Sequence, residues 1–187
     1  NLLSKLFHQQ FGGSLLELMT VVLIVAIMAI VTMPLLQEQI ASREIETIAR
    51  RFIAHAHFAR NQALHLGSPV LISPRKENQW ESGWLVRGAC LGKAKQLDCN
   101  GQNWFSQEGI YPIYFKGGSK GFSDPHSNQK GILFNAAGAA KTGQGGFVAN
   151  RLILGHLKMP HLERHLIMGS GGRWRICDPS TDTKACK

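Results

Sequence analysis

The most constraining feature of this chain is a long uncharged run near its N-terminus. Nineteen consecutive residues, from Leu18 to Leu36, carry no charge, and only Pro34 interrupts their helix-forming character. A helix of this length can cross the hydrocarbon core of a bilayer. A secretory signal peptide would place its cleavage site after such a run, whereas here the small residues suited to cleavage come before it. The run therefore predicts a retained membrane anchor.

A short motif precedes the anchor and reads Gly12-Gly13-Ser-Leu-Leu-Glu17-Leu-Met. It resembles the type IV prepilin signal, which pilins share with the pseudopilins of type II secretion. In that family a peptidase cuts after a glycine, and the fifth residue of the mature chain is a glutamate. The resemblance implies a leader over 1–12 and cleavage between Gly12 and Gly13. The family usually has phenylalanine where this chain has Gly13, and a plain signal anchor is the competing interpretation.

Glu17 lies just inside the anchor, where a carboxylate is costly unless it is paired or reaches the headgroups. The residues alone leave both interpretations open. The resemblance implies that Glu17 pairs with the N-terminal amine of a neighbouring subunit during filament assembly. It also implies other pilins and a prepilin peptidase as partners. The subunit would sit in the inner membrane by one helix, with its head in the periplasm, before it reaches the pilus or cell surface.

A helical period continues beyond Pro34 and predicts one helix over 13–67, bent at Pro34, with the anchor ending near residue 36. Gly67 and Pro69 are the expected stop signals. Its apolar stripe must pack on something, and a soluble coiled coil is the alternative. The stripe consists of Ala41, Ile45, Ile48, Ala49, Phe52, Ala56, Ala59, Ala63 and Leu66.

Residues 68–187 have a different pattern, in which Gly, Pro, Asn and Ser separate short apolar or alternating runs. This pattern predicts an antiparallel β-sheet head, so the whole chain is expected to be an α+β, pilin-like ladle. The predicted strands are Val70–Ser73, Gly83–Arg87, Ile110–Phe115, Gly131–Phe134, Phe147–Leu154, Arg164–Met168 and Arg173–Cys177.

The four cysteines form two local pairs, Cys90 with Cys99 and Cys177 with Cys186. Neither spacing matches a zinc knuckle or a redox-active motif. An even number of cysteines outside the cytoplasm indicates disulfides. Three connectivities exist, and proximity favours the sequential one. A C-terminal disulfide loop is also common among pilins.

Enzyme chemistry is not indicated, because acidic residues are few and no nucleophile elbow or phosphate-binding loop is present. We therefore expect no catalytic residues, no cofactor and no metal. His161 and His165 are four residues apart, but in a segment predicted as strand they are interpreted as surface histidines. The helix histidines His55, His57 and His65 do not share one face and receive no role.

Charge is unevenly distributed along the chain. The net charge is +9, yet residues 1–109 hold 10 Lys/Arg against 8 Asp/Glu, and residues 110–187 hold 11 against 4. A basic half of this kind suggests an anionic partner, although a solvated cationic surface gives the same composition. Within it, Gly172-Arg173-Trp174-Arg175 stands directly before Cys177. On a strand, both arginines would share one face about 7 Å apart, suited to phosphates, or would simply be exposed.

This motif extends the resemblance to the GspH/FimT family of minor pilins, whose FimT branch ends in a Gly-Arg-Xaa-Arg motif associated with DNA binding in natural transformation. It implies that Arg173 and Arg175 bind DNA without strong sequence preference. Weaker candidates are Lys141, Arg151, Lys158, Arg164, Lys184 and Lys187. One rival is a structural minor pilin or type II secretion pseudopilin that primes or tips a filament. Another is an adhesin that uses the loops at Gly117–Asp124 or Cys90–Cys99. Single- or double-stranded preference and filament position stay open.

Overall fold

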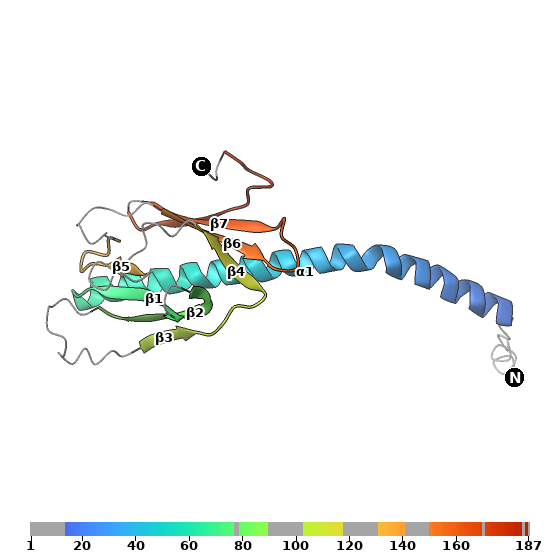
Figure 1. Ribbon diagram of the computed structural model, residues 1–187, viewed down its shortest axis with the longest axis horizontal. Coiled ribbons are helices and arrows are strands. Elements are labelled where there is room, and N and C mark those ends of the chain that lie inside the picture. The colour runs from blue at the N-terminus through green and yellow to red at the C-terminus, as the bar shows by residue number, and fades with distance from the viewer. Residues whose placement is uncertain are drawn as a thin grey trace, which may run out of the picture. The chain divides into compact units, whose positions relative to one another are not determined.

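The computed structural model describes residues 14–76, 79–89, 103–117, 131–140, 150–169, 171–184 and 186. Its first element is the helix α1, Leu15–Leu66, which is 52 residues long and continues on both sides of Pro34. The chain divides into two compact units, one ending at Ile40 and the other spanning Ala41–Lys187, and α1 contributes to both (Figure 1). We refer to Ala41–Lys187 as the head.

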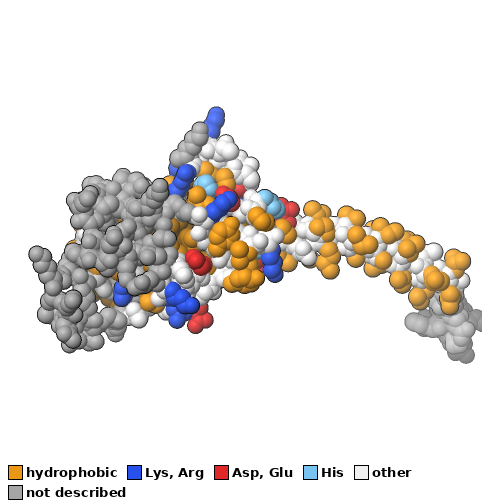
Figure 2. All heavy atoms as spheres, viewed as in Figure 1, with side chains coloured by type: hydrophobic (Ala, Val, Ile, Leu, Met, Phe, Trp, Pro, Cys, Tyr) orange, Lys and Arg blue, Asp and Glu red, His pale blue; other side chains and the backbone are white. Residues whose placement is uncertain are grey.

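The described part of the first unit, residues 14–40, consists almost entirely of the exposed apolar half of α1. Every side chain from Ser14 to Ile40 is exposed, and hydrophobic side chains dominate its visible surface (Figure 2). Its most apolar 18-residue window has a mean hydropathy of 2.7, so α1 is long and apolar enough to cross a membrane. Apolar surface of this extent requires lipid or neighbouring subunits to cover it.

The second half of α1 buries the predicted apolar stripe. Its buried residues are Ala41, Ile45, Ala49, Phe52, His55, Ala56, Ala59 and Ala63. Ile48 is only partly buried and Leu66 is 49 % exposed, because the helix is about to leave the core there. Gly67 follows with a φ of 60°, the left-handed conformation that commonly ends a helix. The predicted stop signal is therefore confirmed.

The strands are antiparallel as predicted, but they divide into two four-stranded sheets rather than forming one. The first sheet has the order β3 (Asn103–Gln107), β2 (Gln79–Gly88), β1 (Val70–Lys76) and β5 (Ile132–Phe134). The second has the order β4 (Ile113–Gly117), β6 (Asn150–His156), β7 (Glu163–Met168) and β8 (Trp174–Cys177). Strand β3 was not among the predicted strands, because its residues do not alternate clearly between apolar and polar.

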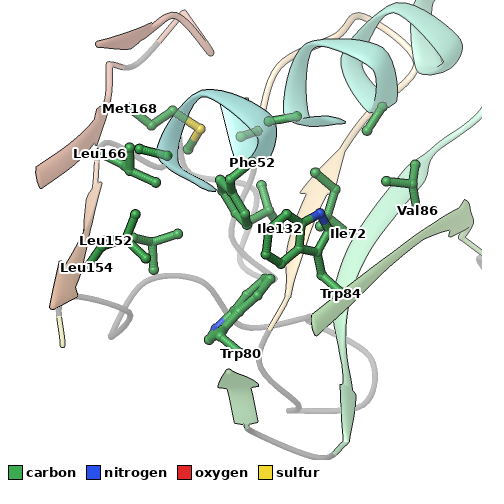
Figure 3. Packing of buried hydrophobic residues seen from close by; sticks show 14 of the residues in the cluster. Phe52, Ile72, Trp80, Trp84, Val86, Ile132, Leu152, Leu154, Leu166 and Met168 are labelled. Atoms are coloured by element: carbon green, nitrogen blue, oxygen red, sulfur yellow. The ribbon is translucent and has the colours of Figure 1, made fainter. Parts of the chain in front are cut away.

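The core lies where α1 meets both sheets, and Phe52 is its centre (Figure 3). On one side of the ring lie Trp80 and Trp84 from β2, and on the other lie residues of the second sheet such as Leu166 and Met168. All five side chains are almost fully buried. One helix thus holds the two sheets together, as hydrophobic burial requires of a domain this small.

Two buried histidines, for which the sequence predicted no role, connect α1 to the sheets. Nδ1 of His55 accepts a 2.9 Å hydrogen bond from Nε1 of Trp84, and burial, aided by Arg51, lowers the pKa of His55 and keeps the ring neutral for this purpose. Nε2 of His156 lies 3.0 Å from a carboxylate oxygen of Glu44. Both histidines are therefore structural.

Candidate nucleic-acid interface

The β7–β8 hairpin carries the arginine motif. The amide of Gly169 donates to the carbonyl of Arg173 over 2.9 Å, and the amide of Gly172 donates back to the carbonyl of Gly169 over 2.9 Å. Strand β8 then begins at Trp174 and pairs with β7 alone, which makes it an edge strand. The turn that these hydrogen bonds close places the motif at an accessible edge of the second sheet.

The structure explains why the motif has a glycine at position 172. Gly172 is buried with a φ of 72°, a backbone conformation that residues other than glycine rarely adopt. A Cβ there would lie 3.3 Å from Nε of Arg60 on α1. That nitrogen cannot move away without breaking a hydrogen bond, because it donates to the carbonyl of Gly138 over 2.9 Å. Gly172 therefore lets the hairpin approach the helix closely.

Replacing Gly172 by alanine is expected to lower the free energy of unfolding by about 1–3 kcal/mol, from left-handed backbone strain and displacement of Arg60. Denaturant unfolding followed by tryptophan fluorescence measures this, since Trp80, Trp84, Trp104 and Trp174 all lie in the head. Gly171→Ala is the matched control, because its Cβ would meet nothing within 4 Å. Equal losses in the two variants would contradict the packing role.

The residues of β8 alternate between the core and the solvent, as the sequence predicts. Trp174 is half-buried, with its ring 5.6 Å from that of Phe52 in an edge-on arrangement, and Ile176 also packs against the core. Arg173, directly before the strand, and Arg175 are exposed. Two residues of extended chain separate their Cα atoms by about 7 Å. The tryptophan therefore fixes the segment while the guanidiniums face outward.

Strand register adds Arg151 to this face. Ile167 of β7 is paired with Arg151 of β6 on one side and with Arg175 of β8 on the other. Residues paired across antiparallel strands lie on the same face of a sheet, and two strand spacings amount to about 10 Å. Arg151 and Arg175 are both exposed and lie in one row across the sheet. Together with Arg173, we call them the arginine row. The sequence nominated Arg151 only weakly, because pairing between distant segments cannot be read from a single chain.

The C-terminal loop is closed by the predicted Cys177–Cys186 disulfide, whose Cα atoms are 5.5 Å apart. Both cysteines are buried. A guanidinium nitrogen of Arg151 donates to the carbonyl of Cys186 over 3.3 Å, so the loop packs beside the arginine row. Lys184, a predicted candidate, is exposed on this same loop. The disulfide therefore holds one more cation on the segment next to the row.

Arg164 has a different role from the one predicted. Its side chain is only 11 % exposed, and its guanidinium lies 2.8 Å from Asp178 and 3.4 Å from Glu46. Burial alone would raise the pKa of Asp178, but hydrogen bonds from Ser180 and the charge of Arg164 hold that pKa below its usual value. Arg164 thus joins α1 to the C-terminal loop, and we remove it from the DNA-binding set.

The remaining predicted cations are Lys141, Lys158 and Lys187, and the structure describes Lys158, which does not join the arginine row. Lys158 is exposed two residues beyond the far end of β6. The strand steps from Arg151 to His156 alone span about 16 Å. Lys141 and Lys187 lie outside the described residues, as do Gly12, Gly13, Cys90, Cys99 and most of the Gly117–Asp124 loop.

The two histidines considered for metal binding do not form a ligand set in the described structure. His161 is exposed in the turn before β7, and His165 lies within β7, where one ring nitrogen is 3.6 Å from Glu163. Within the part of the chain that the structure describes, no group of three or more metal-ligating side chains gathers. Among the described residues of this face, the arginine row is therefore the feature whose chemistry indicates a kind of ligand.

Comparison with known protein families shows which family has this architecture. The profile of a family described as type II transport protein GspH matches residues 49–186, which include both sheets and the C-terminal disulfide. The chain belongs to the GspH family. Its family and fold are those of structural pilins rather than of enzymes. No curated protein sequence matches the chain.

Solved structures show the same fold at low identity. The type IV minor pilin FimU of Pseudomonas aeruginosa is 15 % identical, with a TM-score of 0.51 over 78 % of this chain and 96 % of FimU. The minor pseudopilin EpsH of the Vibrio cholerae type 2 secretion system is 11 % identical, with a TM-score of 0.50 over 73 % of this chain and 98 % of EpsH. The pilin-like α+β prediction is confirmed. This GspH-family chain is a minor pilin or pseudopilin.

Proposed function

We propose that this GspH-family chain is a DNA-binding minor pilin of the FimT-like branch, which captures extracellular DNA on a type IV pilus for uptake in natural transformation. The observation that carries the proposal is the row of exposed arginines on β8 and β6. Arg173 and Arg175 come from the Gly-Arg-Xaa-Arg motif, and Arg151 stands in register with Arg175. A planar guanidinium binds a phosphate with two parallel hydrogen bonds, so such a row suits a polyanion.

The surroundings of the row support phosphate contact rather than base reading. The row lies on a sheet whose other face packs on α1, and neither a recognition helix nor a projecting ribbon is present among the described residues. Contacts to phosphates fix position without reading sequence. The expected dissociation constant is on the order of 10⁻⁴–10⁻⁶ M at physiological salt, typical of non-specific binding.

Two labelled duplexes of equal length and unrelated sequence test this expectation. We expect the full-length protein, in neutral detergent, to bind both with dissociation constants within about threefold of each other, because phosphates are common to both. Fluorescence anisotropy measures both constants. Absence of binding at low salt would refute the DNA-binding proposal and leave the structural minor pilin or secretion pseudopilin, which needs only the helix and head.

The N-terminal region is proposed to mature as a prepilin. Residues 1–12 form the leader, residues 13–67 the helix with its membrane anchor, and residues 68–187 the β-rich head. A prepilin peptidase removes the leader after Gly12, which the mass of the mature protein would show. The head then lies in the periplasm until assembly. The support is the Gly12 and Glu17 spacing together with the exposed apolar helix of a pilin family.

Glu17 is expected to matter for assembly and not for the fold of the head. It lies in the first turn of α1, in the unit that ends at Ile40. We expect Glu17→Ala to reduce the filament-associated fraction in cells several-fold while the tryptophan-monitored melt stays unchanged. Glu38→Ala removes an acidic residue from beyond the anchor and is the matched control. Normal incorporation of Glu17→Ala would rule out the pairing role.

A further inference from the structure

A groove runs beside the arginine motif, between α1 and the edge strand β8. Four of its lining residues are Arg50, Ile53, Ala54 and His57, which the helical repeat places on one face of α1. The facing side is formed by Trp174, Arg175 and Ile176 of β8. We call it the α1–β8 groove. Its volume is about 550 Å³, and it lies entirely within the head.

The groove combines an apolar floor with cationic edges. Ile53, Trp174 and Ile176 are half-buried and present hydrocarbon and an aromatic ring. On its two sides stand the exposed Arg175 and Arg50, whose side chain is 73 % exposed. Arg50 lies 2.7 Å from the half-buried Glu46 four residues earlier, and because the guanidinium itself is exposed, this helix pair competes only weakly with a phosphate. Such a site fits a flat, partly apolar ligand that carries negative charge on either side.

A nucleotide with an unpaired base has this chemistry. We propose that the α1–β8 groove holds an unpaired base of single-stranded DNA, with the adjacent phosphates on Arg175 and Arg50. The inference rests on the proposed function and specifies its substrate. In a duplex the bases are stacked and paired, so that only phosphates reach the arginine row. A single strand can turn a base out onto aromatic and guanidinium surfaces.

The expected consequence is a preference for single strands over duplex of about tenfold, within the range that one base–aromatic contact provides. The site is sequence-tolerant, because stacking uses the face that every base has. The preference depends on the open groove, whereas duplex binding depends on phosphate contacts with the arginine row. The two kinds of binding can therefore be separated by a substitution that fills the groove and leaves its charges unchanged.

Ala54→Leu is that substitution, because Ala54 is exposed in the groove wall and leucine is compatible with a helix. Thr47→Leu is the matched control. Thr47 is exposed seven residues earlier, about 10 Å along the helix, and does not line the groove. Ala54→Gln repeats the test with a polar side chain if leucine alters the tryptophan-monitored melt.

The probes are a labelled 15-nucleotide thymidine oligonucleotide and a labelled 15-base-pair duplex, titrated against the full-length protein in neutral detergent. We expect the parent and Thr47→Leu to bind the single strand about tenfold more tightly than the duplex. Ala54→Leu should remove this preference and leave the duplex affinity unchanged. Equal affinity of the parent for both probes, or a preference that survives in Ala54→Leu, would overturn the groove assignment while DNA binding stands.

Absence of binding to either probe would overturn both the groove assignment and the proposed function. Concentration-dependent self-association of the parent that Ala54→Leu abolishes, without any single-strand preference, would instead assign the groove to a second copy of the chain. That result would also overturn the inference.

Discussion

Phe52→Ala is expected to lower the free energy of unfolding of the head by roughly 3–5 kcal/mol. The Phe52 ring is fully buried, and its centroid lies 5.0–5.9 Å from the rings of Trp80, Trp84, Phe115 and Trp174. Truncation removes a side chain that contacts aromatic residues of both sheets. Because a domain is stable by only about 5–15 kcal/mol, the variant should lie near the limit of folding.

Denaturant unfolding by tryptophan fluorescence measures this loss on the full chain, since the anchor contains no tryptophan. Phe105→Ala is the matched control. Phe105 is 42 % exposed on the edge strand β3 and contacts the rings of His55 and Phe58. Truncating Phe105 should lower the free energy of unfolding by less than half as much as truncating Phe52. Similar losses in the two variants would mean that Phe52 is not the centre of the core.

The second large effect concerns binding rather than stability. The double substitution Arg173→Gln with Arg175→Gln is expected to weaken duplex binding by at least tenfold at low salt, because it removes two phosphate contacts. Its melt should change little, since both side chains are exposed. The matched control is Arg43→Gln with Arg75→Gln, two exposed arginines elsewhere on the head. It removes the same charge, and equal weakening by it would show that only net charge matters.

Much of the fold could be predicted from the sequence because its signals are local. The uncharged run, the alanine-rich stripe and the Gly67 stop all act within one helix, and α1 confirms them. Strand alternation predicted that Arg173 and Arg175 share one face, and both are exposed in the structure while Trp174 between them packs against the core. The division into two sheets could not be predicted, because it depends on pairing between segments far apart in the chain.

The candidate surface shows the same limit. The motif itself was visible, but only the register of β6, β7 and β8 places Arg151 in the row of Arg175. The same register turns Arg164 inward, because it pairs with the buried Leu154 and reaches Glu46 on α1. The sequence alone does not distinguish Arg151 from Arg164, because both are simply cations in the basic half of the chain. Their faces follow from strand positions that composition cannot define.

The most direct test of the account is the salt dependence of duplex binding by the parent and by the Arg173→Gln, Arg175→Gln variant. Each phosphate contact contributes about 0.9 to the slope of log affinity against log salt concentration. If both arginines bind phosphates, the slope of the variant should be flatter than that of the parent by about 1.8. Parallel lines with equal affinities across the salt range would contradict the account and make the motif purely structural.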